Sequence, residues 1–163
     1  MTTADTVSVL IPCKNAAPFL AETLESALGR SAFKRAAPSF FSWLGVSMYL
    51  PREANLNALR SIAASAAPGS ELVFTYLDQA GFENRGQSAS AAAHQLAATV
   101  SSVGEPFLSG FHPHELANDL ASCGLELLED FSDQELVARY DPEGRNRLGG
   151  SGGSHVARAR VRG

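Results

Sequence analysis

The sequence predicts an α/β domain with helices on both faces of a mainly parallel sheet. Apolar runs rich in β-branched and aromatic residues alternate with segments of helical periodicity. Proline and glycine separate these segments, in the order strand, helix, strand, which is typical of βαβ units. The length of 163 residues, with 45% hydrophobic residues, fits one globular domain, 1–163.

The first half of the chain contains two predicted strands and two predicted helices. Residues 7–13 form a β-branched run and predict a buried strand. Apolar residues at helical spacing predict a helix over 19–28, with Gly29 as its C-cap. Residues 39–45 predict the second strand. Pro51 then begins a second helix, because a first-turn residue has no intrahelical N–H bond to lose. The apolar face of this helix comprises Leu56, Leu59, Ile62, Ala63 and Ala66.

The second half continues the alternation. Residues 71–77 predict the third strand and residues 125–131 the fourth. Between them, a helix is expected to begin at Pro113 and to end at Gly124. The apolar face of this helix comprises Leu116, Ala117, Leu120 and Ala121.

The chain ends with a short predicted helix and a predicted strand. Ser132 and Glu135 have the S-x-x-E spacing of a capping box, which predicts a helix that extends to Tyr140. Residues 155–162 alternate small apolar residues with arginines, which predicts a half-buried strand. The arginines are expected on the wet face of an edge strand.

Composition and charge exclude several classes of function. The net charge is −4, and the body of the chain has no basic stripe, so we expect no nucleic-acid partner. No segment approaches the roughly 20 apolar residues of a membrane span, and the N-terminus has no basic n-region of a signal peptide. Cys13 and Cys123 have no metal-ligand spacing. They are expected to be free, buried thiols, and the expected location is the cytoplasm.

Residues 37–77 carry a specific pattern. It reads Pro-x-Phe-Phe-Ser-Trp-Leu-Gly-Val, then Met-Tyr-Leu, then a helix, then Pro-Gly-Ser-x-Leu-Val-Phe-x-Tyr. This order resembles the leucine carboxyl methyltransferase-like family of class I S-adenosylmethionine (SAM)-dependent methyltransferases, and a weaker collinear likeness extends through 37–163. The resemblance implies a Rossmann-like domain whose C-terminal strand is antiparallel.

The resemblance also implies a cofactor, SAM, and a small-molecule acceptor that is methylated on a carboxyl or hydroxyl oxygen. The residues expected at the cofactor are Trp43, Leu44, Gly45, Tyr49, Lys14 and Asn15. The family often has a glutamate at the position of Leu44, which itself cannot accept a hydrogen bond. An apolar substrate wall is expected from Tyr76, Phe107 and Phe111. No catalytic residue is assigned: a carboxylate acceptor is already ionised and needs no base, whereas a hydroxyl acceptor needs a base that the sequence does not identify.

One feature of the family is missing from this sequence. Class I methyltransferases hold SAM on a glycine-rich turn after the first strand, where only glycine allows close backbone approach. No such turn follows a predicted strand here. The sequence therefore predicts an incomplete domain that starts near the family's third strand and is either a truncated product or one piece of a larger enzyme.

Two alternatives stay open, and a metal site is not expected. The chain could be a non-catalytic remnant or interaction module, with self-association through open sheet edges. Residues 7–28 also resemble the start of inverting glycosyltransferases with a GT-A fold, so 1–36 are ambiguous and a fused product is possible. His112 and His114 lack a third metal ligand, and His112 is expected instead as a helix N-cap.

Overall fold

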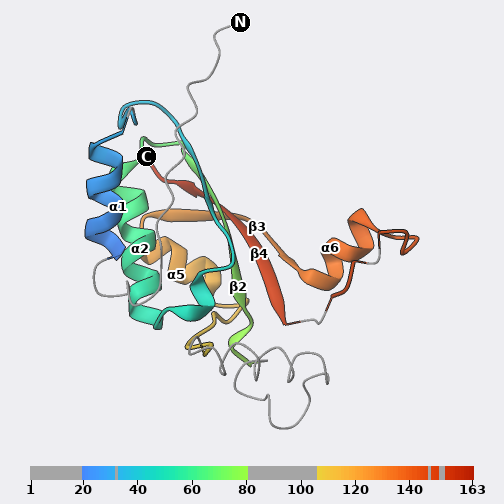
Figure 1. Cartoon of the computed structure of the whole chain (residues 1–163). Coiled ribbons are helices and arrows are strands. Elements are labelled where there is room, and N and C mark those ends of the chain that lie inside the picture. Colours follow the sequence, from blue (N-terminus) through green and yellow to red (C-terminus); the bar gives the residue numbers. More distant parts are fainter. Residues whose placement is uncertain (1–19, 32, 81–105, 147, 151–152) are drawn as a thin grey trace, which may run out of the picture.

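The structure is a computed structural model that describes residues 20–31, 33–80, 106–146, 148–150 and 153–163. A four-stranded sheet has helices stacked along one side, and α6 stands apart at the end of the sheet (Figure 1). The elements in chain order are α1 (Leu20–Gly29), β1 (Phe40–Trp43), the 3-10 turn η1 (Ser47–Tyr49), α2 (Arg52–Ser65), β2 (Glu71–Leu77), α5 (Leu116–Ser122), β3 (Leu125–Ser132), α6 (Asp133–Tyr140) and β4 (Ser154–Val161).

The sheet has the strand order β1-β2-β4-β3. Strands β1 and β2 are parallel, and β4 is antiparallel to both of its neighbours, so β4 alone runs against the other three. This confirms the mainly parallel sheet with an antiparallel C-terminal strand. The prediction that this last strand lies at an edge is wrong, because β4 inserts between β2 and β3. Its arginines do face away from the core, since Ala157, Ala159 and Val161 are the buried residues of the strand.

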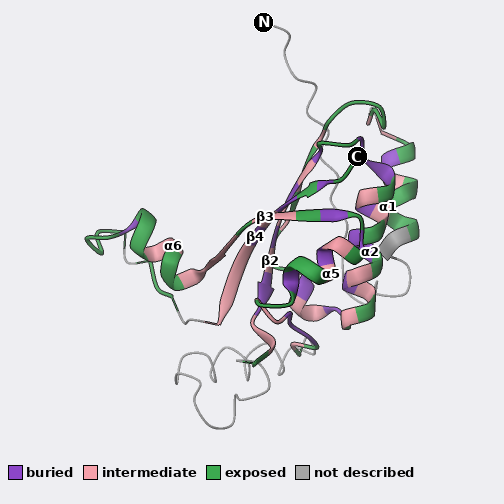
Figure 2. Cartoon of the chain, turned by 180° about the vertical axis from the view of Figure 1, so that it is seen from behind, coloured by how far each residue is buried: buried purple, intermediate pink, exposed green. Residues whose placement is uncertain are grey.

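The core lies between one face of the sheet and the helices α2 and α5. In Figure 2 the buried residues gather where these helices meet the strands. Alternate residues of β2 point into this core, as a period of two requires. The fully buried side chains are Leu59, Leu72, Phe74, Tyr76, Phe111, Leu116, Leu120 and Leu125. Each such burial stabilises the fold by roughly 1.5–3 kcal/mol, so this face dominates the stability.

The opposite face of the sheet, here called the outer face, is charged and partly apolar. Its centre is Arg158, which donates to Glu71 at 2.9 Å and to Glu129 at 3.2 Å. Phe40 of β1 is 65% exposed, and Leu44, which follows the strand, is 53% exposed. In the described part of the chain, α6 is the helix that reaches this face, at its end. Parallel sheets are normally covered on both faces, so the predicted two-sided cover is seen here only in part.

Two helix ends differ from prediction and one agrees. Gly29 is the last residue of α1 rather than its C-cap. The N-cap of α5 is Glu115, without a side-chain cap, so the N-cap role predicted for His112 is wrong. The capping box of α6 is confirmed: Ser132 Oγ accepts from the Glu135 N–H at 3.3 Å, and Glu135 accepts from the Ser132 N–H at 2.8 Å.

Candidate functional site

The turn that follows β1 is the candidate site. Trp43 packs on Phe74 with 6.3 Å between ring centroids, and next to it Leu44 is half exposed. Gly45 has φ +71°, a conformation that favours glycine, and its N–H donates to Thr75 Oγ1 at 2.7 Å. A Cβ on Gly45 would meet no atom of the described residues within 4 Å. The backbone of this turn is therefore open to close approach, as a ligand at a strand end requires.

A buried polar network holds this turn from beneath. Ser47 Oγ donates to the Thr75 carbonyl at 2.6 Å. Asn55 Nδ2 donates to the Ser47 carbonyl at 2.9 Å and to Ser109 Oγ at 3.1 Å, while Ser109 Oγ donates to the Leu50 carbonyl at 2.6 Å. The three side chains are buried, so their hydrogen bonds fix η1 against β2 and α2.

Asn55 is the member of this network that sequence reasoning missed. It is fully buried on α2, on the same face as Leu59 and Ile62. Its Nδ2 points at carbonyl oxygens, which fixes the orientation of the amide, and its Oδ1 has no partner among the described residues. A buried acceptor without a partner costs about 1–3 kcal/mol. The signal was in the sequence, because an asparagine in register with apolar residues of a helix requires an unusual set of partners.

The structure brings together two of the predicted aromatic residues and separates the others. Tyr49 and Phe107 lie beside the turn with 5.4 Å between ring centroids. Tyr76 and Phe111, by contrast, are fully buried, with 5.7 Å between their rings. They support the strand end from within the core and expose no surface to a substrate in the structure. Of these four aromatic residues, Tyr49 and Phe107 are the two that are only partly buried.

The loop that carries Phe107 is held tightly against the strand ends. The Leu108 N–H donates to the Met48 carbonyl at 2.7 Å, and the Phe111 N–H donates to the Leu77 carbonyl at 2.9 Å. A Cβ on Gly110 would lie 2.3 Å from the Leu77 carbonyl oxygen, so glycine is required for this close approach. The loop therefore has a fixed position over the ends of β1 and β2.

The other residues singled out from the sequence are Lys14, Asn15, two histidines and two cysteines. Lys14, Asn15 and Cys13 lie outside the described residues. His112 and His114 have 5.4 Å between ring centroids, and within the described ranges no group of three His, Cys, Asp or Glu side chains is placed to hold a metal. Cys123 is free and buried, and burial raises the pKa of its thiol.

A second polar cluster lies at the start of β4, and no sequence signal predicted it. The Tyr76 hydroxyl donates to Asp130 Oδ2 at 2.7 Å, and His155 Nδ1 lies 3.2 Å from Asp130 Oδ1. Burial raises the pKa of Tyr76 strongly, and Asp130 raises it further, so the hydroxyl stays protonated. These side chains come from three strands, which only the tertiary fold places side by side.

Comparison with known proteins agrees with the resemblance. Residues 14–63, less than half of the chain, match the family of leucine carboxyl methyltransferases. The YktD protein of Bacillus subtilis (strain 168), named for S-adenosyl-L-methionine-dependent methyl transfer, is 36% identical over 98 residues. That alignment covers 60% of this chain and 32% of YktD. The chain thus spans about a third of the curated relative that it matches.

Two solved structures have a similar fold. A DUF574-family protein from Streptomyces avermitilis has a TM-score of 0.59 at 17% identity, over 89% of this chain and 52% of that protein. A protein from Thermobifida fusca YX, named as a methyltransferase, has a TM-score of 0.56 at 18% identity, over 88% of this chain and 52% of that protein. These likenesses confirm the α/β fold class.

The family match confirms the resemblance to leucine carboxyl methyltransferases, and it extends further toward the N-terminus than the pattern in 37–77. It includes residues 14–36, for which the sequence left a methyltransferase and a glycosyltransferase interpretation open, and it favours the first. SAM, the cofactor that the resemblance implied, is the one in the name of the B. subtilis relative. The turn after β1 lies inside the matched range.

Proposed function

We propose that the chain contributes one part of an SAM-dependent methyltransferase that transfers a methyl group to a carboxyl or hydroxyl oxygen of a small molecule. The turn Trp43-Leu44-Gly45 would contact the cofactor. The observation that carries the proposal is the coincidence of the family match over 14–63 with an open glycine turn at the end of a parallel strand. Ligands of open α/β sheets bind just beyond such strand ends.

The residues of the turn fit a cofactor that needs backbone approach and apolar contact. No described residue fills the space beside the Gly45 backbone, and the hydrogen bond of Gly45 to Thr75 holds the turn in place. The half-exposed side chain of Leu44 offers an apolar surface without a hydrogen-bond acceptor. Recognition of the ribose and of the amino acid part would therefore fall to groups other than Leu44.

When bound, SAM would supply a methyl group carried on a positively charged sulfur, to a carboxylate directly or to a hydroxyl oxygen that gives up its proton to a base. The contribution of this chain would be to position the reactants and to exclude water. Leu44, Tyr49 and Phe107 form apolar surface around the turn. A carboxylate acceptor arrives ionised, so in-line orientation accounts for much of the rate.

We expect the reaction to take place in the cytoplasm. The described part of the chain has no helix with the length and apolarity to cross a bilayer.

Calorimetric titration of the chain with SAM and with its neutral product, S-adenosylhomocysteine, tests the proposal. Both ligands should bind, because most of their contacts are shared. The Leu44→Lys variant places a cation next to the positively charged sulfur, so it should weaken SAM more than the neutral product.

Leu148→Lys is the matched control, because Leu148 is also half exposed but lies in the loop that follows α6. It should leave the affinity for both ligands unchanged. If neither ligand binds to the wild-type chain at millimolar concentration, the chain alone does not form the site. If both bind but Leu44→Lys weakens them equally, the sulfonium does not lie near this turn.

A second candidate function is a non-catalytic interaction module that keeps only the fold. The observation that favours it is the outer face, with Phe40 and Leu44 more than half exposed. Large exposed side chains grouped on one face are typical of interaction surfaces. Absence of SAM binding together with concentration-dependent association would favour this alternative.

A further inference from the structure

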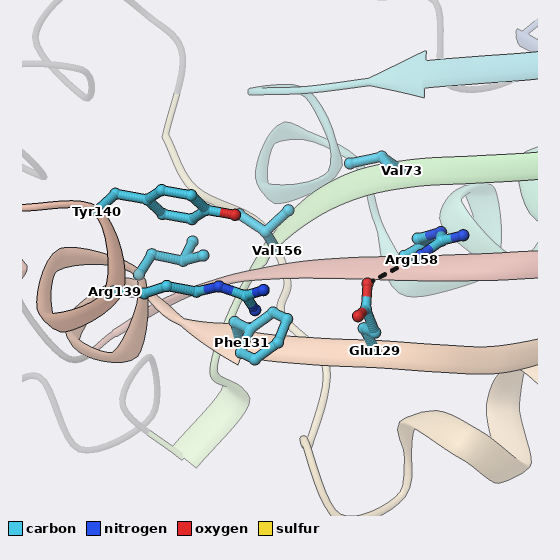
Figure 3. A pocket seen from close by; sticks show the side chains of 8 residues that line it. Val73, Glu129, Phe131, Arg139, Tyr140, Val156 and Arg158 are labelled. Atoms are coloured by element: carbon cyan, nitrogen blue, oxygen red, sulfur yellow. Dashed lines mark hydrogen bonds and ion pairs between the residues drawn. The ribbon is translucent and has the colours of Figure 1, made fainter.

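A hollow lies on the outer face of the sheet, and its lining does not include the turn after β1. It measures about 190 Å³ and lies between the sheet and α6 (Figure 3). Its walls are mostly apolar: Val73 and Val156 form the floor, Phe131 one side, and Leu136 and Tyr140 the side that α6 supplies. Liquid water occupies about 30 Å³ per molecule, so the hollow has room for roughly six waters or one small ring.

The position of these walls follows from a register shift in β3. The pairing with β4 shifts between Leu127 and Glu129. Before the shift Leu127 packs against the core, and after it Phe131 lines the hollow on the opposite face. Bulges re-aim side chains in this way. The register shift therefore gives the end of the sheet an aromatic residue on the outer face, where α6 can close over it.

The two arginines that line the hollow differ in their carboxylate partners. Arg158 is satisfied, because it donates to both oxygens of Glu71, at 2.9 and 3.1 Å, and to Glu129 at 3.2 Å. Arg139 has no carboxylate within ion-pair distance among the described residues. Its guanidinium instead lies 5.3 Å from the centre of the Phe131 ring and 5.6 Å from that of Tyr140. The two aromatic rings thus hold the Arg139 guanidinium at the rim of the hollow, and its N–H donors remain available to a ligand.

We propose that this hollow binds a small apolar carboxylate, with its ring or chain against Phe131 and Val156 and its carboxylate on the guanidinium of Arg139. A carboxylate matches the planar fork of arginine with two parallel hydrogen bonds, and the apolar walls favour a ligand without further charge. The site does not depend on the proposed methyltransferase function, because it shares no residue with the turn Trp43-Leu44-Gly45.

Titration of the ¹³C-methyl-labelled chain with benzoate, followed by NMR, tests the site. Saturable shifts are expected at the methyl groups of Val73, Val156 and Leu136. Benzamide has the same shape without the charge, and it should bind about tenfold more weakly or worse, since hydrogen bonds to charged groups are worth about 1.5–3 kcal/mol. Arg139→Gln should weaken benzoate by a similar factor and leave benzamide unchanged.

Arg139→Lys and Arg60→Gln complete the test. Arg139→Lys keeps the charge but loses the fork, so benzoate should bind with intermediate affinity. Arg60 lies on α2, bonded to Glu53 and Asn57, and its replacement by glutamine should leave benzoate binding unchanged. Because Arg139 is exposed on α6, its variants should fold. Equal binding of benzoate and benzamide, no saturable shift, or a dimer in solution that covers Arg139 would each overturn the proposal.

Discussion

At the scale of single residues, His155 connects protonation to stability. Its ring stacks on Tyr76 with 4.9 Å between centroids, and its Nδ1 faces Asp130. Burial lowers the pKa of His155, but the hydrogen bond to Asp130 and the charges of Asp130, Asp78 and Asp133 outweigh burial, so the pKa is raised. A raised pKa in the folded state means that protonation favours folding. This contribution is full below the ordinary value of 6.5 and is lost as pH rises through the folded value.

We therefore expect the free energy of unfolding to fall as pH rises from 6.5, by the part that the charged imidazole contributes. Urea unfolding followed by the fluorescence of Trp43, the one tryptophan of the chain, measures it at each pH. His155→Gln cannot titrate, so it should be less stable than the wild type at low pH and lose this slope. A variant that keeps the full slope would show that other groups cause it.

The roles of single residues were easiest to predict where the local backbone conformation determines them. Gly45 was expected to end a strand, and its positive φ shows why glycine stands where the strand gives way to a turn. Tyr76 and Phe111 were expected to face a substrate, yet both are buried, because the loop over β2 packs their rings into the core. The partners of His155 could not be predicted either. Asp130 is 25 residues away in sequence, and only the pairing of β3 with β4 brings the two together.

At the scale of elements, α6 depends on its capping box. Ser132→Ala removes the acceptor for the Glu135 N–H and should destabilise the helix by about 1 kcal/mol. Amide hydrogen exchange measures the local stability of each helix and strand. In the variant, the amides of α6 should exchange several-fold faster, while the exchange of those of β2 should change little. Ser122→Ala is the control, because the Ser122 hydroxyl donates at the C-terminal end of α5 and does not cap an N-terminus. Equal effects of the two changes would contradict the role of the capping box.

The elements were predicted better than their arrangement. The bounds of β2 and the capping box of α6 follow from periodicity and from local spacing, both of which the sequence carries directly. The place of β4 does not, because alternation with arginines describes any strand with one wet face, whether central or at an edge. The helical spacing placed Ala117 in the core, but Ala117 is exposed, because α5 is short and packs through Leu116 and Leu120.

At the scale of the whole molecule, the described part of the chain has a core on one side of the sheet and edges at β1 and β3. Helices α1, α2 and α5 lie on one side of the sheet in both views, and α6 reaches only the end of the outer face (Figures 1 and 2). The fold class was predictable from the alternation of strands and helices. Which surfaces stay open was not, because exposure depends on what else packs on the sheet. Open edges offer unpaired backbone groups to another chain.

Strand β1 provides the sharpest test of such pairing. In the described structure it pairs with β2 on one side, where the Ser39 carbonyl accepts from the Glu71 N–H at 2.9 Å. Backbone groups alternate in direction along a strand, so those of Ser42, three residues on, point away from β2, toward the edge of β1 that no strand of the described residues covers. We propose that this edge pairs with a second copy of the chain. Sedimentation velocity should then show association that increases with concentration.

Ser42→Pro removes the N–H on the side of β1 that faces away from β2 without removing a donor to β2, and proline is tolerated on edge strands. The variant should therefore associate more weakly than the wild type, while its unfolding free energy changes by no more than about 1 kcal/mol. Ser42→Ala keeps the N–H and should associate like the wild type, which separates the backbone effect from loss of the hydroxyl. If Ser42→Pro associates as strongly as Ser42→Ala, the contact between copies does not use the edge of β1, and the outer face with its exposed Phe40 and Leu44 becomes the surface to examine.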